Sequence, residues 1–386
     1  MTQVMKKLFL FLAGALLICS SCEKASTKED FSDLSARGNA NCYLISKAGS
    51  YHFDAEVKGN GSKSLKPLSA GLLWESKPGL ISGIELKDGE IHFSINGEGG
   101  NALIAARGEN SEIIWSWHIW FPKEAPKDIR LKSGYTMMNM NLGALASDFT
   151  SDKDVDPYGL LYQWGRKDPF PSSPERTGDV STVGYPVYGP DGEQVKITNS
   201  PWTSTKDNSI AYSIAHPTVC LSNYAQFKTS RDWLRSEESD DTLWGELKTI
   251  YDPCPVGYKV SPDEAFKTFT SSGAYTVNPA EFDVADLNGD GIINEMDYNY
   301  GWYFNCENGS AFFPAAARYD GSYAMLMGSV SGIWGSYWSC NVRESSLFDG
   351  GAGVALSFMK QDQLLTVSAT ASAAKADAYS VRCVRE

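Results

Sequence analysis

The chain has few histidines, and it lacks the sequence motifs that mark many enzyme active sites. Its glycine-rich turn at 97–100 follows a predicted strand but precedes no helix, so it does not predict a dinucleotide site. The segment 328–332 has Val330 at its centre and is therefore not a nucleophile elbow. The four histidines are His52, His92, His118 and His216. None of them stands at a metal-ligand spacing from another. These absences predict a protein that is not an enzyme.

Long apolar runs are scarce as well. The run at 8–18 has eleven residues, follows Lys6 and Lys7, and is too short to span a bilayer. Small residues then lead to Cys22, as in bacterial lipoprotein leaders, although Cys19 stands where leucine is more usual. We expect residues 1–21 to be a signal peptide and Cys22 to carry the lipid. An ordinary secretory signal, with Cys22 a plain thiol, is the alternative.

Basic residues are outnumbered: the chain has 34 Lys and Arg against 47 Asp and Glu, and its net charge is −13. An acidic surface disfavours nucleic acid and anionic lipid as partners, and it suits cation binding. Since Glu23 rather than Asp follows Cys22, the lipoprotein resembles the outer-membrane type. We therefore expect a protein anchored by lipid in the outer membrane and exposed at the cell surface.

The region behind the leader divides into a tether and a β-rich domain. Residues 22–39 are polar and predict a flexible tether, in which Arg37 is either a protease site or an ordinary linker residue. Residues 40–125 predict a β-sandwich, because short alternating strands are punctuated by turns. The strongest turn signal is Asp88-Gly89, which predicts a two-residue hairpin between 84–87 and 90–95. Further strands are expected at 102–106 and 113–120.

The second domain is expected at 133–386, after a seam rich in proline and charge. It holds the few predicted helices, at 232–236, at 242–251 and after a capping box at 261–264. The last of these is expected to bury Ala265, Phe266 and Phe269. The predicted fold class is mostly β with an α+β second domain.

One segment, 286–297, has the spacing of an EF-hand calcium loop. Calcium prefers six to eight hard oxygen ligands, and the loop supplies them at the expected positions around Gly291. A polar surface loop with Asn-Gly and Asp-Gly turns is the alternative. The candidate ligands are Asp286, Asn288, Asp290, the backbone carbonyl of Ile292, Asn294 and Asp297. We expect a structural Ca²⁺, with Ile293 pinning the loop to a core.

An aromatic segment follows this loop. Tyr298, Tyr300 and Tyr303 are candidates for a ligand platform, because aromatic faces stack on sugars. The alternative is core packing, since Trp302 and Phe304 alternate with their neighbours as in a half-buried strand.

Six cysteines remain when Cys19 and Cys22 are set aside. Six thiols allow fifteen pairings, export permits disulfides, and six buried free thiols are the alternative. The six are Cys42, Cys220, Cys254, Cys306, Cys340 and Cys383.

Five short motifs run in order through the second domain. Together they resemble the Fibrobacter succinogenes major paralogous (FISUMP) domain, a variant of the C-type-lectin-like fold. They lie at 162–168 (YQWGRKD), 252–258 (DPCPVGY), 313–318 (FPAAAR), 335–340 (GSYWSC) and 381–385 (VRCVR). The resemblance implies a Cys254–Cys383 disulfide. Beyond what it implies, we expect Cys306–Cys340 as a second pair and Cys42 and Cys220 as free thiols. The sequence motifs with which calcium-dependent lectins bind sugars are missing, so a primary lectin calcium site is not expected.

These features lead to three functional hypotheses. The first is a surface adhesin or ligand-binding protein whose C-terminal module recognises a glycan or a host protein. The second, implied by the resemblance, is a structural subunit at the tip of a pilus, in contact with pilin subunits. The third, an enzyme of unknown type, rests only on the broad fold and is the weakest.

Overall fold

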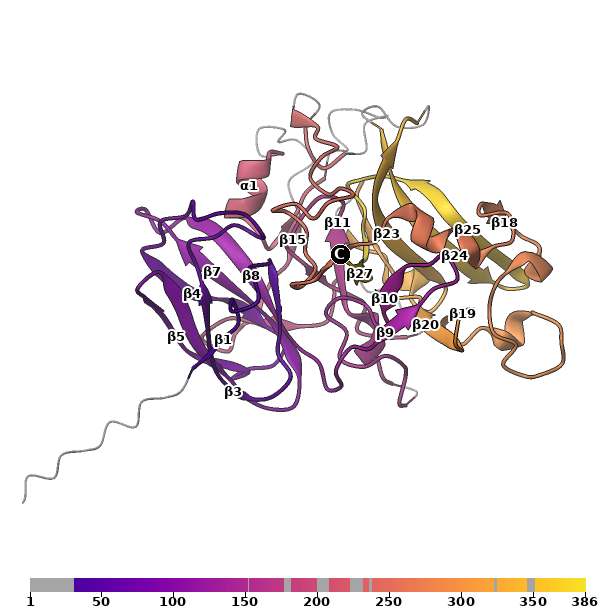
Figure 1. The fold of residues 1–386 in the computed structure, drawn as a ribbon, viewed down its shortest axis with the longest axis horizontal. Coiled ribbons are helices and arrows are strands. Elements are labelled where there is room, and N and C mark those ends of the chain that lie inside the picture. The colour runs from indigo at the N-terminus through magenta and orange to yellow at the C-terminus, as the bar shows by residue number, and fades with distance from the viewer. Residues whose placement is uncertain are drawn as a thin grey trace, which may run out of the picture. The chain divides into compact units, whose positions relative to one another are not determined.

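The computed structural model describes residues 31–151, 153–176, 182–199, 208–222, 232–235, 238–322, 325–345 and 351–386. Residues Phe31–Glu386 form one compact unit. The fold is mostly β, as predicted, with 40% strand and 8% helix (Figure 1). In the described residues, no helix has both the length and the apolar character needed to cross a membrane.

Two sheets build the region predicted to be a sandwich. One has the order β1-β3-β6-β5 and the other the order β14-β13-β4-β7-β8-β2. The first contains β1 Ser32–Asp33, β3 Gly49–Asp54, β6 Glu90–Ile95 and β5 Ile81–Lys87. The second contains β14 Gln194–Val195, β13 Val187–Tyr188, β4 Ser69–Glu75, β7 Gly100–Arg107, β8 Ile113–Phe121 and β2 Cys42–Leu44.

Both sheets contribute to one hydrophobic cluster. Phe53 and Phe93 come from the first sheet and Ile104 and Trp117 from the second, and all four are buried in it. Two sheets that share a core in this way have the packing of a sandwich. The predicted hairpin is confirmed, because Asp88 and Gly89 both have positive φ, at 52° and 83°.

The second part of the chain adds a nine-stranded and a four-stranded sheet and two strand pairs. The first sheet has the path β12-β11-β26-β23-β24-β25-β18 with β21 and β22 beside it, and the second the order β17-β27-β10-β9. The nine strands are β12 Phe170–Pro171, β11 Leu160–Gln163, β26 Ala378–Ser380, β23 Trp334–Arg343, β24 Ala352–Gln361, β25 Leu364–Ala373, β18 Tyr275–Thr276, β21 Tyr319–Asp320 and β22 Met325–Leu326. The others are β17 Tyr258–Val260, β27 Cys383–Arg385, β10 Thr136–Met138, β9 Asp128–Arg130, β15 Thr198–Asn199, β16 Val219–Cys220, β19 Gly301–Asn305 and β20 Ser310–Pro314.

The helices of the described residues are short. One is an α-helix and the others are 3₁₀ turns: α1 Ile210–Ala215, η1 Asp156–Tyr158, η3 Asp263–Phe269, η4 Pro279–Glu281, η5 Glu295–Asp297 and η6 Gly328–Val330. The helix η3 buries Ala265, Phe266 and Phe269 as predicted. Its capping box is absent, because the Ser261 hydroxyl donates to the Arg382 carbonyl instead of capping the turn.

The helix predicted at 242–251 is wrong, and so is the one at 232–236 in its described part. The apolar stripe at 242–251 does not lie on one face, since Leu243 is buried whereas Leu247 is 84% exposed. Side chains take two carbonyls that a helix would use: the Thr249 hydroxyl donates to Leu243 O, and Lys259 Nζ donates to Glu246 O. Side-chain hydrogen bonds therefore replace the helical ones here.

The predicted tether is ordered at its end. Strand β1 pairs in parallel with β3, opposing Ser32 to Tyr51, and Leu34 packs against the sandwich cluster. Residues 31–39 therefore belong to the folded unit, which corrects the prediction of a flexible segment up to 39.

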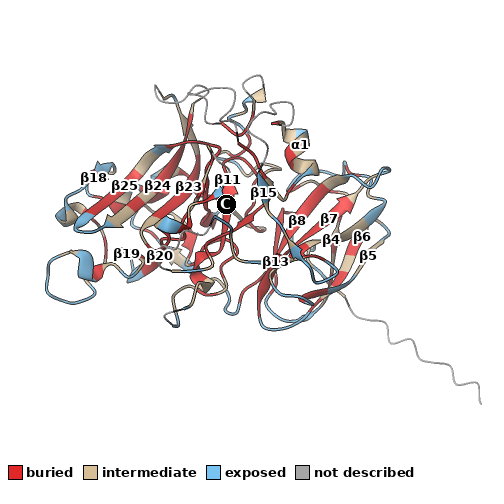
Figure 2. Cartoon of the chain, turned by 180° about the vertical axis from the view of Figure 1, so that it is seen from behind, coloured by how far each residue is buried: buried red, intermediate tan, exposed pale blue. Residues whose placement is uncertain are grey.

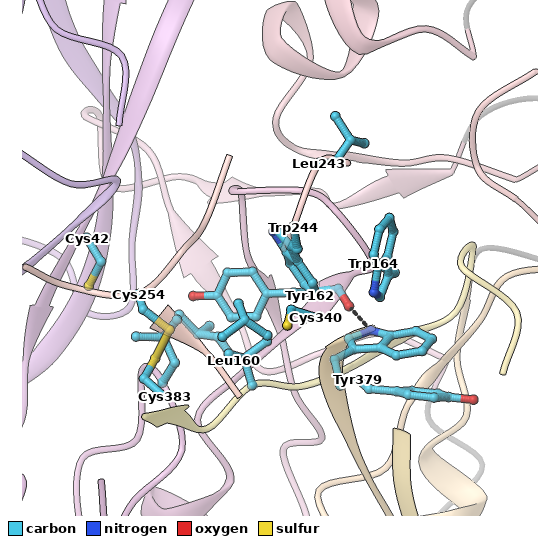
Figure 3. Close-up of a cluster of buried hydrophobic side chains, with 14 of the residues drawn as sticks. Cys42, Leu160, Tyr162, Trp164, Leu243, Trp244, Cys254, Cys340, Tyr379 and Cys383 are labelled. Carbon is cyan, nitrogen blue, oxygen red and sulfur yellow. Dashed lines mark hydrogen bonds between the residues drawn. A yellow bond between two sulfur atoms is a disulfide. The ribbon is translucent and has the colours of Figure 1, made fainter. Parts of the chain in front are cut away.

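A second hydrophobic cluster joins residues on both sides of the predicted seam. Trp74 and Trp120 lie in it with Trp164 and Trp338. Figure 3 shows the part of this cluster around Trp164. Strand β8 is the reason, because both of its faces are buried: Trp117 faces the sandwich core and Trp120 the shared cluster. Figure 2 shows this burial along β7 and β8. The boundary between two separate domains stays a prediction.

Candidate functional site

The motif residues mostly hold the fold together. Gln163 bonds to the backbone of Leu221 and Ala376, and the Trp338 indole donates to the Tyr162 carbonyl. Arg382 is fully buried, donates twice to Asn141 Oδ1 and lies 3.8 Å from the Phe313 ring centroid. These side chains are closed off by the core and cannot contact an external ligand.

The disulfide implied by the family resemblance is present. Cys254 and Cys383 are bonded across a sequence separation of 129 residues (Figure 3). The second predicted pair is wrong, because Cys306 and Cys340 are free and lie in different hydrophobic clusters. Burial raises the pKa of Cys340 to about 12, which makes it an unreactive thiol. Cys42 and Cys220 are also free and buried.

The predicted calcium loop, orange in Figure 1, is folded by its own acidic side chains. Asp286 accepts the N–H groups of Gly289 and Gly291, both at 2.7 Å. Asp297 is fully buried and accepts the N–H groups of Leu287, Asn288 and Asn294 at 2.8, 3.3 and 3.0 Å. Asp290 and Asn288 accept N–H groups in the same way.

This oxygen set fits a hard cation. A carboxylate has about four lone-pair sites, so Asp286 keeps about two free after its hydrogen bonds. The loop contains no Lys or Arg, and Ile293 packs against the neighbouring core as predicted. Its carboxylates are not gathered, however: in the described residues the single cluster of three acidic, His or Cys ligand atoms within 4.8 Å is elsewhere.

The tyrosines after the loop do not form an exposed platform. The Tyr298 hydroxyl donates to the Ile333 carbonyl and its ring packs edge-on against Trp302, as core packing implies, and a ligand role for this residue stays a prediction. The Tyr303 hydroxyl donates to Asp148, and its ring packs on Phe312. Tyr300 is half-buried beside Phe149. A ligand role for Tyr300 and Tyr303 stays a prediction.

A cavity of about 230 Å³ lies over strands β23, β24 and β25. Its floor is made of small side chains, which are Ala355, Ser357, Ala371, Ser372, Ala373 and Ala374. Its walls carry Arg318, from the FPAAAR motif, and Trp334, just before the GSYWSC motif. Sequence analysis missed this cavity, because its residues come from segments that only the pairing of the three strands brings together.

Polar groups converge on one side of the cavity. The Arg318 guanidinium lies 4.2 Å from the Trp334 ring centroid and 3.7 Å from Asp377 Oδ2, and its Nε has no hydrogen-bond partner in the described part of the chain. Asp377 accepts the Tyr379 hydroxyl and the Gly321 N–H, both at 2.7 Å. Burial raises the pKa of Asp377, while the charge of Arg318 opposes this rise. Perturbed charged groups in a cavity are typical of binding sites.

A larger hollow, of about 470 Å³, is lined by Tyr185, Gln194, Thr198, Tyr319 and other residues. Thr182, Asn199 and Met325 in its lining each adjoin in sequence a residue outside the described ranges, and the part of the lining that the structure describes contains no acidic residue. We therefore take the Arg318 cavity as the candidate site, although it is the smaller one.

Two of the histidines lie together, although none stands at a metal-ligand spacing from another in the sequence. His52 on β3 is paired directly opposite His92 on β6. The alternation that predicts these two strands is visible in the sequence, but the register that places His52 opposite His92 is not. His118 is buried and bonds to Asn101 at 2.9 Å, and His216 is exposed.

The predicted lipid-bearing Cys22 lies outside the described residues, and Arg37 is exposed in a turn. No family model, curated protein or solved structure matches the chain. The resemblance to the FISUMP family therefore rests on the five motifs alone.

Proposed function

We propose that this chain is a lipid-anchored surface protein that binds a glycan through the cavity of Arg318 and Trp334. The observation that carries the proposal is the combination of an aromatic wall, a floor of small side chains and a charged pair in one opening. Sugars present C–H faces that pack on aromatic rings and hydroxyl groups that bond to planar polar side chains.

The size of the cavity suggests the part of the glycan that enters it. Pockets for drug-sized ligands have volumes of about 300–1,000 Å³, so 230 Å³ is too small for an oligosaccharide. A single terminal sugar is the better fit. The Arg318 guanidinium, whose side chain is 20% exposed, supplies a donor for a sugar oxygen, and Asp377 supplies an acceptor.

A Ca²⁺ bound in the loop 286–297 has a structural role in this proposal. The loop supplies oxygens of the type that the ion prefers, and its buried Asp297 accepts three N–H groups from within the loop. None of the loop residues lines the Arg318 cavity, so calcium is not expected to touch the glycan.

A glycan array with residues 31–386 tests the proposal. The informative variant is Ala371→Leu, which narrows the cavity and leaves the Arg318–Asp377 pair intact. We expect binding to a subset of glycans and its loss in this variant. Gln194→Ala, at the larger hollow, is the matched control and keeps wild-type binding. Binding to host matrix proteins without any glycan, or glycan binding indifferent to Ala371→Leu, would contradict the proposal.

A further inference from the structure

A cluster of histidine and glutamate side chains lies on the outer face of the sheet β1-β3-β6-β5. In the antiparallel pair β3 and β6, His52 opposes His92 and Asp54 opposes Glu90. Directly opposed residues share a face of a sheet, and so do residues two apart on one strand. His52, His92 and Glu90 therefore project from the same face. The opposite face carries the core residues Phe53 and Ile91.

The ligand atoms of these three side chains converge. His52 Nδ1 lies 3.0 Å and His92 Nε2 lies 3.5 Å from the same Glu90 oxygen, Oε2. All three ligand atoms lie within 4.8 Å of one another. Two ligands at about 2.1 Å from a tetrahedral ion are about 3.4 Å apart. The spacing in the structure is already close to that of ligands around one ion.

The surroundings hold the two imidazoles in place. Their rings are stacked, with centroids 5.1 Å apart and planes at 11°, and Phe31 packs edge-on against His92. The side chains of His52 and His92 are only 17% and 19% exposed, whereas Glu90 is 40% exposed. An ion held here keeps one side open to water.

A plain ion pair does not account for this arrangement. One protonated histidine satisfies one carboxylate oxygen, yet both imidazoles approach the same oxygen of Glu90. Lys87 opposes Glu90 on β5, but it is not among the ion-pair partners of Glu90 in the described residues. Glu85 lies on β5 with Lys87, opposes His92 on β6 and is exposed, so a second carboxylate is near the open side.

We propose that His52, Glu90 and His92 form a binding site for a divalent transition metal, with Zn²⁺ the best fit. Two imidazole nitrogens and one carboxylate oxygen are typical Zn²⁺ ligands, whereas Ca²⁺ takes oxygen alone. The fourth position is open to water or to the nearby Glu85. The site is separate from the loop 286–297 and from the Arg318 cavity, and it does not depend on the glycan proposal.

Isothermal titration of Zn²⁺ into untagged, metal-free residues 31–386 tests the site. We expect the wild-type protein to bind one Zn²⁺ ion per chain. In His92→Gln the affinity for Zn²⁺ should fall at least about tenfold, because even the loss of a group that only hydrogen-bonds to a metal ligand costs that much. His52→Gln and Glu90→Gln are independent tests of the same ligand set if His92→Gln does not fold. His216→Gln, an exposed histidine elsewhere, keeps wild-type affinity, and so does Asp290→Ala in the calcium loop.

Absorption of bound Co²⁺ gives a second readout, since the d–d bands report nitrogen and oxygen ligands. Wild-type protein that binds no Zn²⁺ would overturn the proposal. Equal affinity in wild type and in all three ligand variants would overturn it as well.

Discussion

Replacing Lys167 by Met tests whether the motif 162–168 is locked to the sandwich strand β8. The ammonium group of Lys167 lies 2.7 Å from Asp168 Oδ1 and 2.6 Å from Ser116 Oγ, and it faces the Trp115 ring at 4.6 Å. The side chains of Lys167 and Asp168 are 2% and 4% exposed. Methionine keeps most of the volume but leaves Asp168 as a buried charge without its cation.

Removing one partner of a buried ion pair costs about 3–5 kcal/mol, because the remaining charge is desolvated and unpaired. Unfolding entropy is roughly 2.1 cal/mol/K per residue, so over the unit Phe31–Glu386 the melting temperature should fall by about 4–7 °C. Urea unfolding followed by tryptophan fluorescence gives the free energy, and calorimetry gives the melting temperature.

The matched control is Lys267→Met. Lys267 pairs with Glu264 at 3.1 Å, but both side chains are about half exposed, at 47% and 50%. Exposed pairs contribute less than about 1 kcal/mol. If Lys167→Met costs no more than this control, the pair is not buried as described, and the reasoning about the shared core is refuted.

Three further predictions concern protons, the disulfide and calcium. Burial lowers the pKa of His118 from 6.5 to about 3; the unfolded chain therefore binds a proton that the folded chain does not, and stability falls as pH drops below 6.5. Between pH 7 and pH 5 this loss is about 2 kcal/mol, and His118→Gln should remove it in urea titrations whereas His216→Gln should not. Replacing Cys254 and Cys383 by Ser should lower the free energy of unfolding by about 2–5 kcal/mol, as closing a long loop implies, and an unchanged melt would contradict this. Calcium at about 100 times its dissociation constant should raise the melting temperature by about 3–4 °C; Asp290→Ala should abolish the shift, Asp191→Ala should keep it, and a melt indifferent to calcium and chelator would refute the calcium loop.

The sequence predicted best where structure is local. The Asp88-Gly89 turn and the strands around it follow from positive φ and alternation, and the burial of Ala265, Phe266 and Phe269 on η3 follows from their spacing. Prediction from the sequence failed where side chains from distant parts of the chain decide the local backbone structure. The stripe at 242–251 has helical spacing, but Asn41, about 200 residues away, bonds to the carbonyl of Ile250 inside it and to that of Asp252 just after it.

The candidate site was harder to predict for the same reason. Arg318 and Trp334 lie in or next to the recognised motifs. Nothing in the neighbouring sequence distinguishes them from Trp338 and Arg382, which are buried. Likewise His52 and His92 lie 40 residues apart and meet only because β3 and β6 pair in one register. Strand register is set by the whole sheet, so no spacing rule contains it.

Radical footprinting of Trp334 tests the central claim most directly. Among the tryptophans that the structure describes, Trp334 alone lies outside the buried core, so it is the one expected to be oxidised readily. A glycan selected on the array should protect Trp334 from oxidation in wild-type protein. Oxidation of Trp334 that is unchanged at saturating glycan would show that the ligand binds elsewhere and would contradict the account.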